Sequence, residues 1–279
     1  MIVLSHFQIQ PLLKAHQQEL TTAITSTDLN LTTTAGQLTS EGIIYPNDEC
    51  LSWDDAHEIA DAENNCFILE DRSITKIQGF SEFTHRHYTL MPTASAPTML
   101  ISGIPMHRIK DTNPFEDTLS KVKTLAPVAG RVLDTATGLG YTAIEMSKTA
   151  EEVTTIELDP AAQDIARLNP WSRTLFENPK IKQLIGDSFD QIEAFEDHAF
   201  SRILHDPPTF ALAGDLYSLE FYRQLFRVLK SKGRLFHYIG DLNSPSGTRV
   251  SKGAFKRLQE AGFKRVERRH EAFGLLAYK

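Results

Sequence analysis

The stretch Val132-Leu-Asp-Thr-Ala-Thr-Gly-Leu-Gly-Tyr-Thr142 decides the fold. Its apolar, β-branched start predicts a strand that ends at Asp134, and Gly138 and Gly140 predict a tight turn that opens a helix. A strand, a glycine turn and a helix N-terminus let a backbone approach a nucleotide-like ligand closely. The two glycines alone are weak evidence, because both could be ordinary turn residues.

Acidic residues recur at the ends of the strands predicted downstream. Glu157 and Asp187 end the next two strands, with Ser188 directly after the second, and Asp206 ends the fourth. In open α/β sheets, ligands bind outside the carboxyl ends of the parallel strands. Any one of these acids could be a helix cap or a turn residue. Their recurrence on four successive strands favours a ligand site at that edge.

The patterning divides the chain into an N-terminal helix (1–27), a small β-rich domain (28–108) and a Rossmann-like α/β domain (109–279). Alternating strands and helices in the last part predict a parallel sheet with helices on both faces. There we expect strands near 131–135, 153–158, 181–186, 200–206 and 233–239, helices near 115–124, 142–149, 160–168, 188–195, 216–229 and 252–261, and a closing antiparallel pair at 263–271 and 273–278. Before it we expect a helix at 7–25, short strands at 29–34, 42–44, 66–69, 74–78, 88–91 and 98–102, and a helix at 54–64.

The composition of the chain limits the class of protein and the kinds of partner to expect. The chain has 279 residues, of which 41% are hydrophobic and 23% charged, as is ordinary for a soluble globular protein. No apolar run is long enough to span a bilayer, so no membrane partner is expected. Cys50 and Cys66 are interpreted as reduced thiols of a cytoplasmic protein. A formal charge of −7 gives no general attraction to nucleic acid.

The order of these motifs resembles the class I S-adenosylmethionine (SAM)-dependent methyltransferases over roughly the last 150 residues. The resemblance implies SAM as cofactor and assigns roles by position. The methionine part would be held by Asp134, Thr137, Gly138 and Gly140. The ribose would bind Glu157, with Leu158 against the adenine, and Asp187 followed by Ser188 would meet the adenine amino group. Asp206-Pro-Pro would face the transferred methyl group.

A β-rich domain ahead of such a sheet also resembles the layout of spermidine synthases and related aminopropyltransferases. The stretch from Leu216 to Lys230 looks like the helix after their fourth strand. Two departures count against their chemistry. Leu139 stands where their glycine turn carries an acid that favours decarboxylated SAM, and residues 203–205 are Ile-Leu-His where their catalytic aspartate lies. The sequence therefore predicts aminopropyltransferase-like architecture with methyltransferase chemistry.

The whole chain is also similar to a group of predicted archaeal and bacterial methyltransferases. The likeness rests on the stretch Met99-Leu-Ile-Ser-Gly-Ile-Pro-Met-His-Arg108 and on the strand end Phe236-His-Tyr-Ile-Gly240, which includes Tyr238. This resemblance implies no particular substrate.

The acceptor end of the site is expected around Asp206. Its carboxylate and the Pro207 carbonyl could accept hydrogen bonds from an amine nucleophile, and Phe210 could stack on a flat or cationic substrate. The run Asp-Pro-Pro-Thr-Phe resembles the step used by methyltransferases acting on exocyclic base or glutamine nitrogens, although its aromatic residue comes one position late.

Histidines supply further candidates. His205 and His237 lie on neighbouring predicted strands, and either could act as a base near neutral pH or be a hydrogen-bonded structural residue. His85, His87 and His107 lack a specified further ligand, so no metal site is expected. Arg108 and His107 are candidate substrate contacts, because an arginine can bind a carboxylate or phosphate through two bonds.

Several functions remain open from sequence. The first is a SAM-dependent methyltransferase acting on a small molecule, with a nitrogen nucleophile favoured. The others are an RNA or protein N-methyltransferase, an aminopropyltransferase-like enzyme using decarboxylated SAM, and a SAM-binding protein without activity. A small-molecule partner is favoured over nucleic acid by the acidic balance. A homodimer is one assembly to test.

Overall fold

The computed structural model describes residues 1–210 and 212–279. It separates into two compact units. The first comprises Met1–Phe115 and Ala161–Arg173, and the second comprises Glu116–Pro160 and Thr174–Lys279.

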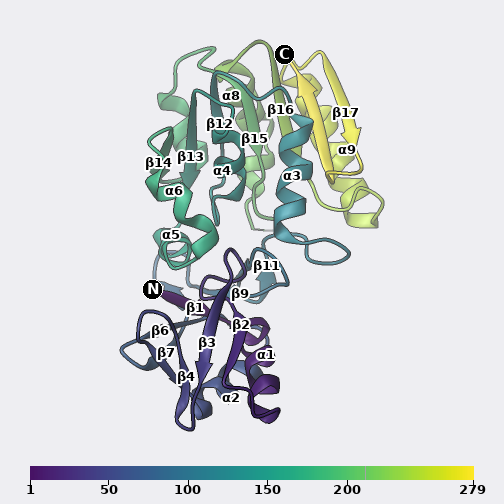
Figure 1. Cartoon of the computed structure of the whole chain (residues 1–279). Coiled ribbons are helices and arrows are strands. Elements are labelled where there is room, and N and C mark those ends of the chain that lie inside the picture. Colours follow the sequence, from purple (N-terminus) through teal and green to yellow (C-terminus); the bar gives the residue numbers. More distant parts are fainter. Residues whose placement is uncertain (211) are drawn as a thin grey trace. The chain divides into compact units, whose positions relative to one another are not determined.

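A seven-stranded sheet forms the second unit, with the order β14-β13-β12-β15-β16-β18-β17. The strands are β12 (Arg131–Asp134), β13 (Glu152–Glu157), β14 (Ile181–Ile185), β15 (Phe200–His205), β16 (Leu229–Tyr238), β17 (Arg265–Arg269) and β18 (Gly274–Tyr278). Strands β12 to β16 are parallel to one another, whereas β18 is antiparallel to both β16 and β17 (Figure 1). The predicted mixed α/β fold with a central parallel sheet is confirmed.

The order of this sheet places β12 between β13 and β15. Asp134 is paired in register with Thr155 of β13 and with Leu204 of β15. All of these strands run the same way, so Asp134, Glu157 and the chain just beyond His205 lie at one edge of the sheet.

From residue 114 onward, helices alternate along the chain with the strands of this sheet. They are α3 (Pro114–Thr124), α4 (Tyr141–Ser147), α5 (Pro160–Arg167), α6 (Arg173–Glu177), α7 (Ser188–Gln191), α8 (Leu219–Val228) and α9 (Pro245–Glu260), with 3-10 turns at Ile192–Ala194 and Gly214–Tyr217. Helix α9 begins seven residues before the predicted start at 252, because the Ser244 hydroxyl caps it by accepting from the Gly247 amide at 3.0 Å. Pro245 suits the first turn, where no amide donor is needed.

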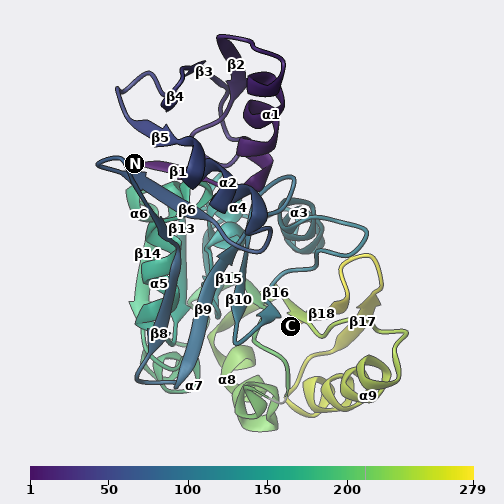
Figure 2. The same cartoon turned by 90° about the horizontal axis from the view of Figure 1, so that it is seen from below.

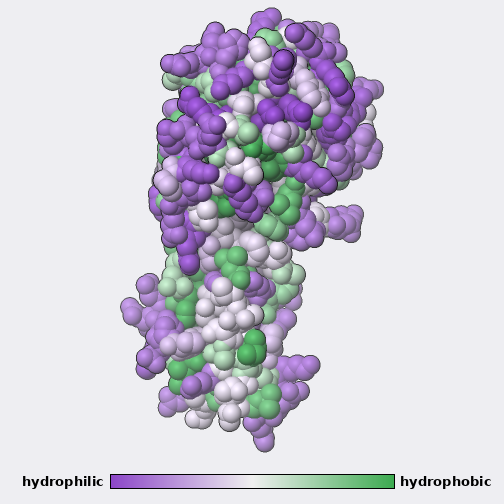
Figure 3. Space-filling model, turned by 45° about the horizontal axis from the view of Figure 1, so that its top comes forward, coloured by the Kyte–Doolittle hydropathy of each residue, from purple (hydrophilic) through white to green (hydrophobic). Residues whose placement is uncertain are grey.

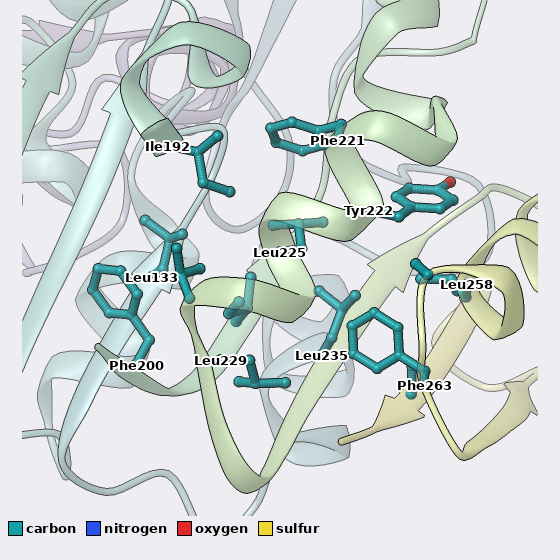
Figure 4. Close-up of a cluster of buried hydrophobic side chains, with 14 of the residues drawn as sticks. Leu133, Ile192, Phe200, Phe221, Tyr222, Leu225, Leu229, Leu235, Leu258 and Phe263 are labelled. Atoms are coloured by element: carbon teal, nitrogen blue, oxygen red, sulfur yellow. The ribbon is translucent and has the colours of Figure 1, made fainter. Parts of the chain in front are cut away.

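The main hydrophobic core lies between this sheet and the helices that follow β15 and β16. Leu133 and Leu235 contribute from strands, and Phe221 and Leu225 from α8, all of them fully buried (Figure 4). On the face drawn in Figure 3, hydrophilic residues cover most of the surface. Among the described residues, no helix combines the length and the apolar character needed to cross a membrane.

Short antiparallel sheets make up most of the first unit. The strands are β1 (Ile2–Leu4), β2 (Thr22–Thr25), β3 (Thr34–Leu38), β4 (Gly42–Ile44), β5 (Cys50–Ser52), β6 (Phe67–Glu70), β7 (Ser73–Lys76), β8 (Gln78–Ser81), β9 (Arg86–Met91), β10 (Thr98–Ile101) and β11 (Ile104–Pro105). They form sheets of order β1-β6-β7, β11-β10-β9-β8 and β2-β3-β4-β5, and Figure 2 shows β8, β9 and β10 side by side. The unit also contains helices α1 (His6–Gln17) and α2 (Trp53–Asp61), nearly all of α5 and a 3-10 turn at Pro170–Ser172.

Two predictions for the first unit are wrong in detail. The helix predicted over 7–25 ends at Gln17, and its last four residues form β2 instead. The strand predicted over 29–34 is absent, because Leu29 and Asn30 have φ angles of 55° and 69°, which interrupt an extended backbone. The helical spacing of apolar residues continues past Gln17, so periodicity alone does not show where the helix ends. Cys50 and Cys66 are both free thiols.

Replacing Leu225 by alanine should lower the free energy of unfolding by about 2–5 kcal/mol, because it removes a fully buried side chain and leaves a cavity. The matched control is Leu119→Ala on α3, where the side chain is 38% exposed and the loss should be much smaller. Urea unfolding followed by circular dichroism measures both. Equal losses would contradict the placement of this core.

Candidate functional site

Asp134 lies buried beneath the glycine turn. Its side chain is fully buried, and its Oδ2 accepts a hydrogen bond of 2.7 Å from the Thr142 hydroxyl on α4. Its Oδ1 accepts from the Ala136 amide at 3.4 Å. Burial raises the pKa of Asp134 to about 7, and the nearby negative charges of Asp206 and Glu157 act in the same direction. The two hydrogen bonds act in the opposite direction, because they stabilise the ionised form. Asp134 therefore ties the end of β12 to the start of α4.

The glycine turn has one open side and one packed side. Gly138 has a φ of 51°, and a Cβ there would meet nothing within 4 Å. Gly140 has a φ of 77°, and a Cβ there would lie 2.6 Å from Leu175. Gly140 is therefore needed for packing, whereas Gly138 leaves space for a group that approaches the backbone. Leu139, between them, is only 1% exposed.

Glu157 is bound to that same turn. Its Oε2 accepts from the Gly138 amide at 2.8 Å and its Oε1 accepts from the Asp159 amide at 3.1 Å. Burial raises the pKa of Glu157 despite these bonds. A second contact joins the turn to β13: the hydroxyl oxygens of Thr137 and Thr155 lie 2.7 Å apart. The carboxylate is thus held in a fixed orientation at the edge of the sheet.

Apolar side chains flank Glu157. Leu158 follows it and is 40% exposed, and Ile185 is paired with Glu157 in register and is 45% exposed. Sequence reasoning named Leu158 but missed Ile185. The clue to Ile185 was its position directly before Gly186-Asp187. An oriented carboxylate beside exposed aliphatic side chains suits a ligand with hydroxyl groups and a flat apolar ring.

The third strand end contributes a cap and an anchor. Asp187 is exposed, and its carboxylate caps α7 by accepting from the Phe189 amide at 2.8 Å. Ser188 is buried and donates its hydroxyl to the Thr135 carbonyl at 2.6 Å. Ser188 therefore links the β14 end to the β12 end, and Asp187 has the exposure that a ligand contact needs.

Asp206 is paired with a lysine that sequence reasoning missed. The Lys121 ammonium of α3 lies 2.6 Å from Asp206 Oδ2 and 2.8 Å from Asp117 Oδ2. It also lies 4.2 Å from the centre of the Tyr238 ring. Burial alone would lower the pKa of Lys121, but the charges of Asp206 and Asp117 raise it, so the side chain stays a cation. The available signal was the spacing of four between Asp117 and Lys121 on one predicted helix.

His205 and His237 are enclosed in the core beside this edge. Each ring is fully buried. His205 donates from Nε2 to the Leu216 carbonyl at 2.9 Å and accepts from the Thr135 hydroxyl at 2.6 Å. Burial lowers its pKa to about 3. A neutral ring with both nitrogens engaged fits a structural role.

His237 has a similar environment. It donates from Nδ1 to the His205 carbonyl at 3.3 Å and accepts from the Tyr222 hydroxyl at 2.8 Å. Burial moves its pKa well below the ordinary value. The surroundings of both histidines thus favour the structural role over that of a base.

The segment after Asp206 is held by Tyr217. Pro207 is buried, and the Pro208 carbonyl accepts from the Tyr217 hydroxyl at 3.1 Å. Phe210 is 51% exposed and packs edge-on against Tyr217, with ring centres 5.4 Å apart. A buried tyrosine thus holds the segment that carries Phe210.

The remaining candidates belong to the other unit. His107 follows β11, and its Nδ1 lies 3.0 Å from the Thr98 hydroxyl. Arg108 is the next residue and is partly exposed. His85 and His87 pack against Phe80, with ring-centre distances of 6.5 and 4.8 Å. Within 1–210 and 212–279, no three His, Cys, Asp or Glu side chains are grouped so as to hold a metal ion.

A comparison with known sequences gives a clear relative. The uncharacterized protein MJ1233 of Methanocaldococcus jannaschii is 44% identical over 231 residues, which are 82% of this chain and 78% of that protein. The chain belongs to the family of this archaeal protein. That relative is named only as an uncharacterized protein, so membership assigns no activity. No protein-family model matches the chain.

More distant sequence relatives are aminopropyltransferases. The polyamine aminopropyltransferase of Desulforudis audaxviator is 28% identical over 142 residues, which are 49% of this chain and 51% of that protein. Polyamine aminopropyltransferase 2 of Streptomyces coelicolor is 31% identical over 122 residues, 41% of this chain and 22% of that protein. The chain therefore spans about half or less of the length of these enzymes.

Solved structures agree on the architecture. A spermidine synthase in complex with the transition-state analogue AdoDATO matches with a TM-score of 0.59 and 19% identity, covering 72% of this chain and 71% of that one. The spermidine synthase from Thermotoga maritima matches with a TM-score of 0.56 and 20% identity, over 72% and 70%. At this identity the likeness shows the fold alone. It confirms the predicted spermidine-synthase-like architecture.

The raised pKa of Asp134 predicts a pH-dependent stability. The folded protein holds this proton more tightly than the unfolded chain does, so the contribution is fully present below about pH 4 and is lost as the pH rises to about 7. In Asp134→Asn the residue no longer titrates. The stability of the wild type relative to this variant should fall over that window by a few kcal/mol at most, because each pH unit between the two pKa values contributes about 1.4 kcal/mol.

Urea midpoints of both proteins between about pH 4.5 and 8.5 measure this difference across the window. Parallel curves over the whole range would show that Asp134 is not a buried acid of raised pKa.

Proposed function

We propose that this protein is a SAM-dependent methyltransferase acting on a nitrogen atom of a small molecule. The observation that carries the proposal is that the glycine turn presents no exposed acidic side chain. Leu139 is buried at its centre and Asp134 is enclosed below it, tied to Thr142 and the Ala136 amide. SAM and decarboxylated SAM differ by one carboxylate, so a turn without an exposed acid favours SAM.

The surrounding residues fit a nucleoside bearing a sulfonium. Gly138 leaves open space over the turn. Glu157 is oriented to accept from ribose hydroxyls, and Leu158 and Ile185 offer an apolar surface for the adenine. Asp187 has the exposure needed to accept from the adenine amino group. Bound SAM would supply a methyl group already activated by the positive sulfur, so the protein has mainly to align a nucleophile and exclude water.

Asp206 is the residue proposed to hold the acceptor. Its carboxylate can accept an N–H hydrogen bond and so direct the nitrogen lone pair away from itself. The nitrogen forms a bond to the methyl carbon while the carbon–sulfur bond breaks and its electrons go to sulfur. The proton that the nitrogen no longer needs then passes to Asp206 or to water. Phe210, exposed beside this carboxylate, is proposed to cover a flat acceptor.

Aminopropyl transfer is the second candidate, and the relatives favour it. The proteins matched over part of the chain are named as polyamine aminopropyltransferases, and the structural likeness is to spermidine synthases. The glycine turn and Glu157 would then hold decarboxylated SAM, and the acceptor would be a polyamine. Against it stand the buried Leu139 and the buried, apolar Ile203 and Leu204 before His205.

Calorimetric titration of the protein with SAM and with decarboxylated SAM tests the proposal. We expect SAM to bind at least about tenfold more tightly, a difference of about 1.4 kcal/mol. Tighter binding of decarboxylated SAM would overturn methyl transfer in favour of aminopropyl transfer. Binding of neither would remove the cofactor from this site.

Glu157→Gln should weaken SAM binding by about 1.5–3 kcal/mol, roughly 10- to 150-fold, because a hydrogen bond to a charged acceptor is lost. Glu152→Gln is the matched control. It lies at the opposite end of β13, where its carboxylate pairs with Arg131 and Lys182. Calorimetry should find the control unchanged, and equal losses in both variants would place the nucleoside elsewhere.

Asp206→Asn should leave SAM affinity within about twofold of the wild type and abolish methyl transfer to an identified acceptor. Calorimetry and a methyl-transfer assay measure the two quantities. Loss of SAM binding or of folding in this variant would mean that Asp206 is structural.

A further inference from the structure

The cluster around Asp206 contains a buried cation that the proposed chemistry does not require. Lys121 comes from α3, far in sequence from Asp206, and its side chain is 2% exposed. Its ammonium lies 2.6 Å from Asp206 and 2.8 Å from Asp117. Asp117 is fully buried, whereas the Asp206 side chain is 17% exposed. Asp206 is therefore the member of the cluster that a ligand can reach.

We infer that Lys121 determines acceptor specificity: it selects an acceptor that offers an uncharged N–H group to Asp206, and it disfavours protonated polyamines. This inference rests on the proposed function, because it concerns the acceptor of the same site. The acceptor class is then an amide, a heteroaromatic amine or another nitrogen that is neutral near pH 7.

The first reason is the charge of Asp206. Asp206 shares the Lys121 ammonium, 2.6 Å away, with Asp117, so its charge is already partly balanced by a fixed ion pair. A second ammonium on the same carboxylate would lie a few ångströms from the Lys121 nitrogen, and like charges at that distance repel strongly in a partly buried site. An uncharged N–H donor avoids this repulsion and still gains a hydrogen bond to an ionised acceptor.

The second reason is that Lys121 cannot leave or lose its charge easily. Its ammonium is enclosed by Asp117, Asp206 and the face of the Tyr238 ring, 4.2 Å away. Removing a buried cation from two carboxylates would leave them uncompensated. The positive charge is therefore a fixed feature of the acceptor side.

The third reason is chemical. A nitrogen that attacks the methyl carbon must present its lone pair, and a protonated amine has none. A site that preferred the protonated form would hold the unreactive state. A fixed cation beside the acceptor disfavours that state.

Spermidine binding tests the inference. The full-length protein, loaded with S-adenosylhomocysteine, is titrated with spermidine in a calorimeter. The wild type is compared with the double variant Asp117→Leu/Lys121→Met, which replaces the buried pair by apolar side chains, an exchange that is often neutral for stability. We expect spermidine to bind the double variant at least about tenfold more tightly than the wild type.

A second double variant, Asp117→Asn/Lys121→Gln, is used if the first does not give the wild-type circular dichroism spectrum. The control is Glu152→Gln/Lys182→Met, which removes an ion pair at the far end of β13 and should leave spermidine binding as in the wild type.

The outcomes separate this inference from the proposed function. Spermidine binding that is equally tight in the wild type and the folded double variant, or absent from both while SAM still binds, overturns the inference alone. Failure of SAM to bind the wild type overturns the proposed function and this inference with it.

Discussion

The parallel pairing of β12 with both β13 and β15 is the constraint on which the site depends. Asp134 is in register with Thr155 on one side and Leu204 on the other, so the strand ends that carry Glu157 and Asp206 lie on either side of it. The proximity of these carboxylates affects Asp134, where both charges add to the effect of burial in raising its pKa. A sheet order that did not place β12 between β13 and β15 would separate these acids.

The acids at this edge differ in what they can do, because each has a different environment. Asp134 is enclosed and hydrogen-bonded to the turn, so it shapes the backbone. Glu157 is held by amides of the turn and of its own strand end, which leaves it oriented for hydroxyl donors. Asp206 is paired with a buried lysine and is partly exposed. Three carboxylates in three environments are thus proposed to serve a structural role, a cofactor contact and an acceptor contact.

Local patterns were sufficient to predict most of the second unit. Apolar runs that end in an acid located β12, β13, β14 and β15, since side-chain periodicity and turn residues are local signals. The Lys121–Asp206 pair joins residues on α3 and at the end of β15, and no local pattern connects them. The position of Ile185 beside Glu157 likewise depends on the pairing of β14 with β13. In the first unit, left-handed residues at Leu29 and Asn30 broke a predicted strand that composition favoured. The roles of the site residues stay predictions.

The central claim is that the glycine turn and Glu157 bind the nucleoside of SAM while Asp206, held by Lys121, faces the acceptor. A crystal structure of the protein with S-adenosylhomocysteine tests this claim most directly. The account predicts ribose hydroxyls within hydrogen-bond distance of Glu157, adenine against Leu158 and Ile185, and the sulfur on the Asp206 side of the turn. A nucleoside bound away from Glu157, or a sulfur directed away from Asp206, would contradict it.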